Sequence, residues 1–201
     1  MPSIYELKPK FQQLLSGAVA ALAKAGVTAN QVTVAATVLS LMYGALLLAA
    51  PNTLGLWLGL PVFLFVRMAL NAIDGMLARQ FNQKSALGGL LNEVGDVVSD
   101  AALYLPFALL ANAHAGLVVL VVVLALLTEY IGVTAVMVGA SRRYDGPMGK
   151  SDRAFVFGAA ALAIGLGYGS GVWLNGLLVV VALLSVITVL NRGYRALKEL
   201  A

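Results

Sequence analysis

Cysteine is absent from this chain of 201 residues, and histidine occurs once, at His114. Without cysteine there can be no disulfides, thiol nucleophiles or zinc–thiolate centres. A single histidine likewise excludes metal sites built on several histidines.

Charge is scarce as well, since charged residues make up 11% of the sequence and hydrophobic residues 61%. Soluble domains carry about 25% charged residues, so a mean hydropathy of +0.92 excludes a water-soluble globule. The apolar blocks recur along the whole length. Residues 1–201 are therefore expected to form a single membrane domain with no second, soluble domain.

The apolar blocks predict an all-α integral membrane protein with an amino-terminal amphipathic helix and six transmembrane helices. Lipid cannot satisfy free backbone polar groups, so the spans are expected to be helical. Residues 1–25 mix apolar and charged side chains, as amphipathic interfacial helices do. The six-helix bundle is predicted over residues 31–192, with spans at 31–50, 54–79, 88–111, 117–140, 154–167 and 172–190.

Lys and Arg residues gather on one side of this predicted bundle. Of the thirteen in the sequence, only Arg67 lies inside a span, and the loops near Pro51, His114 and Gly169 contain none. Loops rich in Lys and Arg stay in the cytoplasm. Both termini and the active site are therefore expected there, in a bacterial inner membrane and without a signal peptide. This placement also accounts for the net charge of +4 without a nucleic-acid partner.

Polar residues cluster inside the second and third spans, where each charge costs about 2.5–3.5 kcal/mol on insertion scales. Asn71, Asp74 and Ala78 share one face of the second span, and residues 88, 92, 96 and 100 share one face of the third. A short loop should make these helices antiparallel neighbours, so that Asp74 faces Asp96. Converging carboxylate and amide oxygens suit Mg²⁺ or Mn²⁺. A divalent ion beside a pyrophosphate would be a phosphoryl-transfer site.

These residues resemble the motif of the CDP-alcohol phosphotransferase (CDP-alcohol phosphatidyltransferase) family, D-x2-D-G-x2-A-R-x8-G-x3-D-x3-D. This chain reads Asn71-x2-Asp74-Gly75-x2-Ala78-Arg79-x8-Gly88-x3-Asn92-x3-Asp96, with every spacing kept. The segment 27–33 also looks like the family's stretch before its first span. Family members have six spans and an amphipathic amino-terminal helix, so the resemblance covers nearly the whole chain.

The resemblance implies a reaction in which an alcohol attacks the β-phosphoryl group of a CDP-linked substrate and CMP leaves. Asp96 would be the general base that deprotonates the acceptor hydroxyl. One or two Mg²⁺ or Mn²⁺ ions would be held by Asp74, Asp96, Asn71 and Asn92. The nucleotide pocket would be formed by Gly75, Ala78, Arg79 and Gly88, with Thr28 and Asn30. A homodimer is also implied.

Two asparagines, Asn71 and Asn92, replace aspartates of the family motif. Asparagine can donate a neutral oxygen to a metal but supplies no charge, so two formal negative charges leave the site. Glu93 points about 100° away from Asn92 on an ideal helix, and Asp100 lies one turn deeper. Three alternatives stay open: a site for one ion, a site that binds metal weakly, and an inactive site.

Residues 141–153 form a basic, hydroxyl-rich loop on the same side of the membrane as the motif. Such a loop can hold an anionic group. The resemblance implies that basic residues here bind the acceptor, often a phosphorylated alcohol, and Arg142, Lys150 and Arg153 are our candidates. The alternative is that these residues only fix the topology and contact anionic lipid.

Arg67 is the one cation inside a predicted span. Charged groups at membrane depth pair with one another, so Arg67 is predicted to pair with Asp100 or Glu129, which lie at a similar depth. The alternative is direct contact with substrate.

The leading hypothesis is a membrane phosphatidyltransferase that moves a phosphatidyl group from CDP-diacylglycerol to a small hydroxyl acceptor. The basic loop favours a phosphorylated acceptor, such as glycerol 3-phosphate or an inositol phosphate. One alternative is a transferase of the CDP-choline or CDP-ethanolamine type that acts on diacylglycerol. Another is a non-catalytic member that binds CDP-lipid. A small transporter is disfavoured, because the sequence has neither repeated halves nor interrupted helical segments.

Overall fold

The computed structural model describes residues 8–201, and no β-strand occurs among them. The part of the predicted interfacial helix before Lys8 lies outside the described residues. In chain order the elements are α1 (Lys8–Lys24), α2 (Ala29–Ala49), α3 (Leu54–Gln80), α4 (Ala86–Tyr104), the 3-10 turn η2 (Leu105–Leu109), α5 (Ala115–Met137), α6 (Lys150–Ala163), the π-helical turn η3 (Ile164–Tyr168) and α7 (Val172–Leu200).

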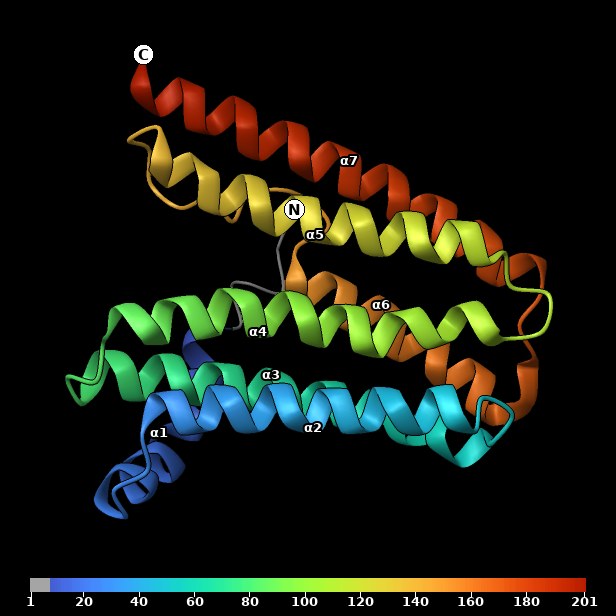
Figure 1. Ribbon diagram of the computed structural model, residues 1–201, viewed down its shortest axis with the longest axis horizontal. Coiled ribbons are helices and arrows are strands. Elements are labelled where there is room, and N and C mark those ends of the chain that lie inside the picture. Colours follow the sequence, from blue (N-terminus) through green and yellow to red (C-terminus); the bar gives the residue numbers. More distant parts are fainter. Residues whose placement is uncertain (1–7) are drawn as a thin grey trace.

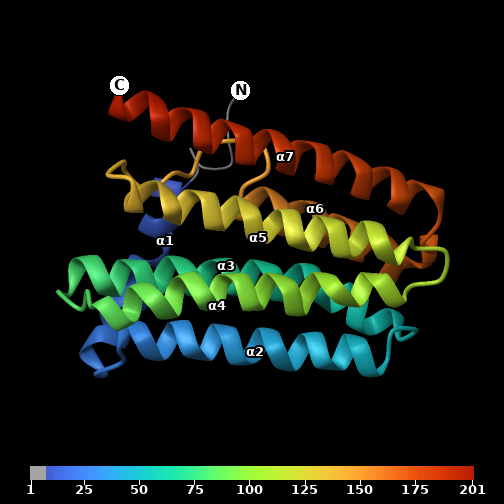
Figure 2. The ribbon, with the colours of Figure 1, turned by 45° about the horizontal axis from the view of Figure 1, so that its top comes forward.

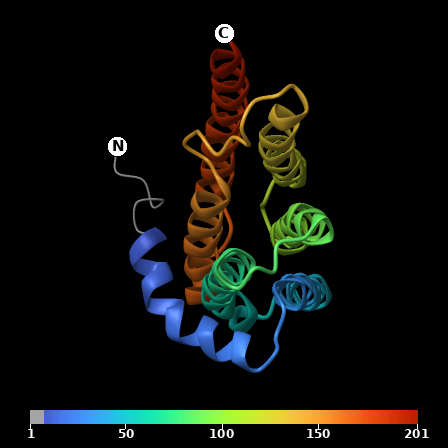
Figure 3. The same ribbon diagram turned by 90° about the vertical axis from the view of Figure 1, so that its left-hand side faces the viewer.

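Helices α2 to α7 run along the long axis of the molecule, and α1 lies across them (Figures 1 and 3). Helix α2 packs against both α3 and α4, α3 packs against α6, and α4 packs against α5. Helices α5 and α7 pack side by side (Figure 2). The backbones of α3 and α4 stay apart over most of their length, although a short loop joins them. Polar side chains therefore have room to meet between these two helices.

Four helices, α2, α3, α5 and α7, are long and apolar enough to cross a membrane. The bundle is thus helical as predicted, but α4 and α6 do not reach the hydropathy or the length of a span. Helix α4 has 19 residues, among them Glu93, Asp96 and Asp100. Helix α6 has 14 residues and begins with Lys150. These two helices can cross lipid only if their charges are neutralised by partners.

Local sequence explains where α2 and α4 begin. The Thr28 hydroxyl accepts a hydrogen bond from the Gln31 backbone N–H at 3.2 Å, and the Gln31 side chain accepts one from the Thr28 N–H at 2.9 Å. This reciprocal pair is a capping box. At α4, the Ser85 hydroxyl accepts from the Gly88 N–H at 2.9 Å. These two caps fix the helix ends that surround the motif.

Helix α3 carries the motif beyond the expected membrane core. It continues through Pro61 for 27 residues, which is about 40 Å at 1.5 Å per residue. A bilayer hydrocarbon core is about 30 Å thick. The carboxyl-terminal turns of α3, which hold Gly75 to Arg79, therefore have the length to reach the membrane surface.

Two boundaries in the last third of the chain differ from the prediction. Helix α6 begins at Lys150 and ends at Ala163, where η3 follows, and Gly167 in η3 has a φ of +89°, which glycine adopts readily. Helix α7 runs on to Leu200, past the predicted end at residue 190. The residues after its apolar block include Arg, Leu, Lys and Glu, which favour helix.

The larger apolar core lies away from the motif, and a smaller cluster that includes Ile73, Met76 and Leu77 packs beside it. Tyr104 stacks on Phe157 with ring centroids 4.0 Å apart, and Phe107 contacts both Phe157 and Trp57 edge to face. Outward-facing side chains such as Phe65 are exposed and apolar, as expected of a surface that meets lipid. The core fixes one end of the helices and leaves the polar residues to the other end.

Candidate active site

A pocket of about 410 Å³ lies between α2, α3 and α4, at the end of the bundle that carries the motif. Eight predicted site residues line it: Asn30, Asn71, Asp74, Gly75, Ala78, Arg79, Gly88 and Asn92. The pocket thus brings most of the predicted nucleotide residues together with three of the four predicted metal ligands. Asp96 and the basic residues of the loop before α6 do not line it.

Two motif glycines provide space at this pocket. A Cβ at Gly88 would lie 2.6 Å from Asn30 Oδ1 and 3.0 Å from Ser85 Oγ, so only glycine allows this close approach of α4 to the start of α2. A Cβ at Gly75 would lie 3.1 Å from Arg79 Nη2. Larger residues at either position would displace polar groups of the pocket.

Asp74 is buried, and its Oδ2 accepts a hydrogen bond from the Thr33 hydroxyl at 2.8 Å. Among the residues that the structure describes, it forms no ion pair. Thr33 lies in the pocket and was not among the predicted residues. Thr33 follows Asn30 by three residues and lies on the same helical face, and this spacing could have identified it from the sequence.

Asp96 is joined to the pocket through Asn71, whose Nδ2 donates to Asp96 Oδ1 at 3.3 Å. The ammonium of Lys150 donates to the same oxygen. Arg67 Nη2 donates to the Asp96 backbone carbonyl at 3.1 Å and lies 3.7 Å from the carboxylate. Donors from α3 and α6 therefore meet at one oxygen of Asp96, and Oδ2 accepts no hydrogen bond from the described residues.

Arg67 pairs with Asp100, and the prediction of that pair is confirmed. The two atoms Arg67 Nη1 and Asp100 Oδ1 are 2.7 Å apart, and both side chains are buried. Arg153 contacts Asp100 Oδ2 at 3.1 Å and Glu129 Oε1 at 3.0 Å. Arg192 lies 3.5 Å from Glu129. A buried ion network therefore joins five helices, and each charge in it depends on its partners because an unpaired buried charge is costly.

Arg153, a predicted acceptor-binding residue, lies inside this network and not at the pocket. Its Nη1 donates to Thr128 Oγ1 at 2.8 Å and to the Met148 carbonyl at 3.1 Å. With Nε and Nη2 bonded to Asp100, all three guanidinium nitrogens have protein partners, and the side chain is fully buried. The sequence suggested an exposed loop residue, whereas the residue belongs to the first turn of α6.

Arg142, also a predicted acceptor residue, is held by a carboxylate of α4. Its Nε and Nη2 donate to Glu93 at 2.6 and 2.5 Å, and its guanidinium lies 4.3 Å from the centre of the Tyr144 ring. Burial acts to lower the pKa of Arg142, but the hydrogen bonds and charge of Glu93 outweigh it and raise that pKa. Its Nη1 is buried and has no hydrogen-bond partner among the described residues.

The start of α2 is tied to the loop between α3 and α4. Thr28 lies just outside the pocket, and its hydroxyl caps α2. The next residue, Ala29, donates its N–H to Gln83 Oε1 at 2.7 Å. Gln83 lines the pocket, and no spacing in the motif pointed to it.

The motif supplies oxygen donors of the kind that bind a divalent cation. The carboxylates of Asp74 and Asp96 and the amide oxygens of Asn71 and Asn92 are ligands that Mg²⁺ and Mn²⁺ prefer. The described residues contain no group of three or more His, Cys, Asp or Glu that could hold a metal. Of the two carboxylates, Asp96 already pairs with Lys150.

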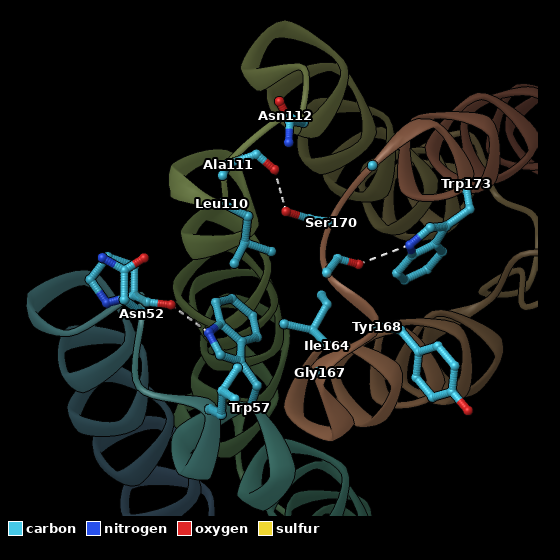
Figure 4. Close-up of a pocket in the computed structure, with 14 residues that line it drawn as sticks. Asn52, Trp57, Leu110, Ala111, Asn112, Ile164, Gly167, Tyr168, Ser170 and Trp173 are labelled. Atoms are coloured by element: carbon cyan, nitrogen blue, oxygen red, sulfur yellow. Dashed lines mark hydrogen bonds between the residues drawn. The ribbon is translucent and has the colours of Figure 1, made fainter.

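A second pocket, of about 430 Å³, lies at the opposite end of the bundle (Figure 4). Trp57, Tyr168 and Trp173 line it, and no charged residue does. The indole N–H groups of Trp57 and Trp173 donate to backbone carbonyls at 2.7 and 2.9 Å. Aromatic residues with polar tips are typical of the membrane interface. This pocket lacks the acids and cations of phosphoryl transfer, so the candidate active site is the one at the motif.

Apolar helices, a buried aspartate in a pocket with small residues and a nearby cluster of cations are the features of an integral membrane enzyme of phosphoryl transfer. A model of the CDP-alcohol phosphatidyltransferase family matches residues 26–191. The chain belongs to this family of CDP-alcohol phosphotransferases, as the motif predicted.

Known proteins resemble the chain over nearly its full length. It is 47% identical over 190 residues to the inner membrane protein YnbA of Escherichia coli, and the aligned region covers 94% of each chain. It is 28% identical over 195 residues to archaetidylinositol phosphate synthase of Pyrococcus horikoshii, covering 97% of both.

Solved structures share the fold. Phosphatidylinositol phosphate synthase of Mycobacterium tuberculosis with CDP-DAG bound has a TM-score of 0.75 at 19% identity, covering 92% of this chain and 94% of that one. The same enzyme in complex with manganese and citrate has a TM-score of 0.72 at 19% identity, covering 90% and 87%.

Proposed function

We propose that this protein transfers a phosphatidyl group from CDP-diacylglycerol to a small phosphorylated alcohol, such as glycerol 3-phosphate or an inositol phosphate, and releases CMP. The observation that carries the proposal is the junction at Asn71, which links the motif pocket to Asp96 and, through Asp96, to Lys150 of α6. A donor pocket and a cation for the acceptor thus meet at one carboxylate. The relative that is an archaetidylinositol phosphate synthase supports this type of reaction.

The proposal includes the full topology of six spans, with α1 at the interface and both termini and the active site in the cytoplasm. Pairing of Asp100 with Arg67 and Arg153 supports membrane crossing by α4 and α6, because the pairs neutralise their buried charges. Helix α1 lies across the bundle, as an interfacial helix would (Figure 3). The E. coli relative, described as an inner membrane protein, supports that location. A homodimer stays a prediction.

The nucleotide of the donor would occupy the pocket. Its volume of about 410 Å³ lies within the range of about 300–1,000 Å³ typical of small-molecule sites. Gly75, Ala78 and Gly88 would let the nucleotide approach the backbone, and Arg79 would contact its phosphates from an exposed position. Asn30 and the Thr28 cap would complete the pocket at the start of α2.

A single Mg²⁺ or Mn²⁺, held by Asp74 and Asp96 with Asn71 and Asn92, would supply positive charge to the pyrophosphate. The manganese complex of the mycobacterial synthase supports an ion of this kind. The Thr33 hydroxyl would orient the Asp74 carboxylate for this role through its hydrogen bond.

Asp96 is the proposed general base. The acceptor hydroxyl oxygen forms a bond to the β-phosphorus, and the bond from that phosphorus to the bridging oxygen breaks. CMP leaves with the bridging oxygen, and the hydroxyl proton passes to Asp96. Asn71 and Lys150 both contact Oδ1, so Oδ2 is the oxygen that can accept this proton.

Arg142 and Lys150 are the proposed contacts for the acceptor's phosphate. Arg142 keeps an unpaired Nη1, and an ammonium has three donors, so Lys150 can contact Asp96 and a phosphate oxygen together. Arg153 would support the acceptor region through Glu129, which also contacts Arg142 at 3.4 Å. Diacylglycerol, the neutral acceptor of the CDP-choline type of reaction, would not need these cations.

The test is CMP release from CDP-diacylglycerol by purified protein in lipid nanodiscs, with Mg²⁺ or Mn²⁺ and a panel of acceptor alcohols. Wild type should release CMP with a phosphorylated acceptor. Asp96→Ala should lower the rate by about 10²–10⁴-fold, the usual contribution of a general base. Asp145→Ala is the matched control, because its carboxylate pairs with Arg143 and Arg195 outside the pocket, and its rate should stay within twofold.

Failure of every acceptor to give CMP, while CDP-diacylglycerol still raises the unfolding temperature, would contradict the transferase and favour a CDP-lipid-binding role. Equal CMP release by Asp96→Ala and wild type would remove Asp96 as the base.

A further inference from the structure

Most carboxylates around the motif already have a cation partner within the described residues. The pairs are Glu93 with Arg142, Asp96 with Lys150, Asp100 with Arg67 and Arg153, and Glu129 with Arg153 and Arg192. Asp74 is the exception, since its partner is the neutral hydroxyl of Thr33. A divalent ion at the motif would therefore meet two different carboxylates. Asp74 has no cation partner among the described residues, whereas Asp96 has Lys150 beside it.

The position of Lys150 is fixed by the fold. Lys150 is the first residue of α6, and the Asp152 carboxylate accepts a hydrogen bond at 3.0 Å from the Gly149 N–H just before it. Arg153, three residues later, is anchored in the buried ion network. The Lys150 side chain is only 19% exposed. The first turn of α6 is thus held at both ends, and it directs the ammonium to Asp96.

The sequence shows the complementary change. Asn71 and Asn92 stand where the family motif has aspartates, so the site has lost negative charge that a second divalent ion would need. Asn71 also donates its amide to Asp96 Oδ1, the oxygen that Lys150 contacts. The same carboxylate oxygen thus receives both an amide donor and an ammonium.

We propose that the ammonium of Lys150 takes the place of a second divalent cation, so that the protein binds one Mg²⁺ or Mn²⁺ centred on Asp74. The inference rests on the proposed function and names the group that supplies the second positive charge at the active site. Lys150 stays covalently attached to α6, so its positive charge at Asp96 does not depend on the metal concentration. The single exchangeable ion is then the one beside Asp74.

The experiment measures Mn²⁺ binding to the purified full chain in detergent micelles, without nucleotide, from the electron paramagnetic resonance signal of free Mn²⁺. Wild type should bind one Mn²⁺ per chain. Lys150→Gln should bind Mn²⁺ about tenfold more tightly, because the variant removes a positive charge that repels the metal ion. Lys150→Arg, which keeps the charge, should retain the wild-type affinity.

Lys84→Gln is the matched control, because it removes a lysine that lines the pocket but does not contact Asp96. Its Mn²⁺ affinity should stay within threefold of wild type. Two Mn²⁺ ions per wild-type chain would overturn the inference, and so would an affinity of Lys150→Gln within twofold of wild type. The wild-type stoichiometry tests the inference even if a variant does not fold.

Metal binding and turnover are measured separately, so the two proposals can fail separately. CMP release by a chain that binds two Mn²⁺ ions would keep the proposed function and remove the role of Lys150. One bound Mn²⁺ and tighter binding by Lys150→Gln, without CMP release from any acceptor, would keep the inference and contradict the function.

Discussion

Asparagine at position 100 should destabilise the protein strongly, because the Asp100 carboxylate lies between two buried cations. Arg67 lies 2.7 Å from Asp100 Oδ1, and Arg153 lies 3.1 Å from Oδ2. The side chains of all three are at most 4% exposed. Removing one partner of a buried ion pair costs about 3–5 kcal/mol, since the other charge is left uncompensated. Asp100→Asn should therefore lower the free energy of unfolding by about 3–5 kcal/mol.

The measurement is unfolding of the purified protein in mixed micelles by increasing the mole fraction of sodium dodecyl sulfate. Asp145→Asn is the control, because its partners Arg143 and Arg195 lie outside the buried network and Arg195 is 60% exposed, and exposed pairs contribute only about 0–1 kcal/mol. The double variant Arg67→Met with Asp100→Asn should recover part of the loss, since it removes one unpaired cation. A loss below about 1 kcal/mol for Asp100→Asn would refute the view that this network depends on full charge pairing.

Two further variants test the pocket. Gly88→Ala should raise the KM for CDP-diacylglycerol at least about tenfold, because the added Cβ would lie 2.6 Å from Asn30 Oδ1, whereas Gly89→Ala meets open space and should leave KM unchanged. Equal KM values for the two variants would argue against close packing at position 88. Thr33→Val removes the hydrogen bond to Asp74 and, at about 1.5–3 kcal/mol for a bond to a charged group, should weaken Mn²⁺ binding measurably. Unchanged Mn²⁺ affinity would exclude a role for the Thr33 hydroxyl in orienting Asp74 for the ion.

The pocket could be predicted from the sequence because its residues lie at fixed helical spacings on two helices joined by a short loop. Asp74, Gly75 and Gly88 lie together for this reason. The pair of Arg67 and Asp100 was predictable from their similar depth, since buried charges require partners.

The rest of the network depends on tertiary packing, which one sequence does not reveal. Glu129 meets Arg153 of α6 and Arg192 of α7, and residue spacing contains no information about which distant helix supplies a cation. Arg153 was predicted to bind the acceptor, as part of the basic loop 141–153. Instead the buried acids of α4 and α5 draw it into the protein. The acids of α4 explain why this helix falls short of an isolated membrane span, whereas α6, with 14 residues, falls short because of its length.

Helix α4 has a consequence for how the protein enters the membrane. A segment with Glu93, Asp96 and Asp100 moves poorly from a translocon into the lipid, since each ionised group opposes this transfer. The first of its cation partners to be synthesised is Arg67, which lies on the preceding helix and pairs with Asp100. We expect α3 and α4 to leave the channel together as a helical hairpin, with Asp100 already bonded to Arg67. The second bond of Asp100, to Arg153, can form only after α6 has been synthesised, and Arg192 of α7 joins the network later still.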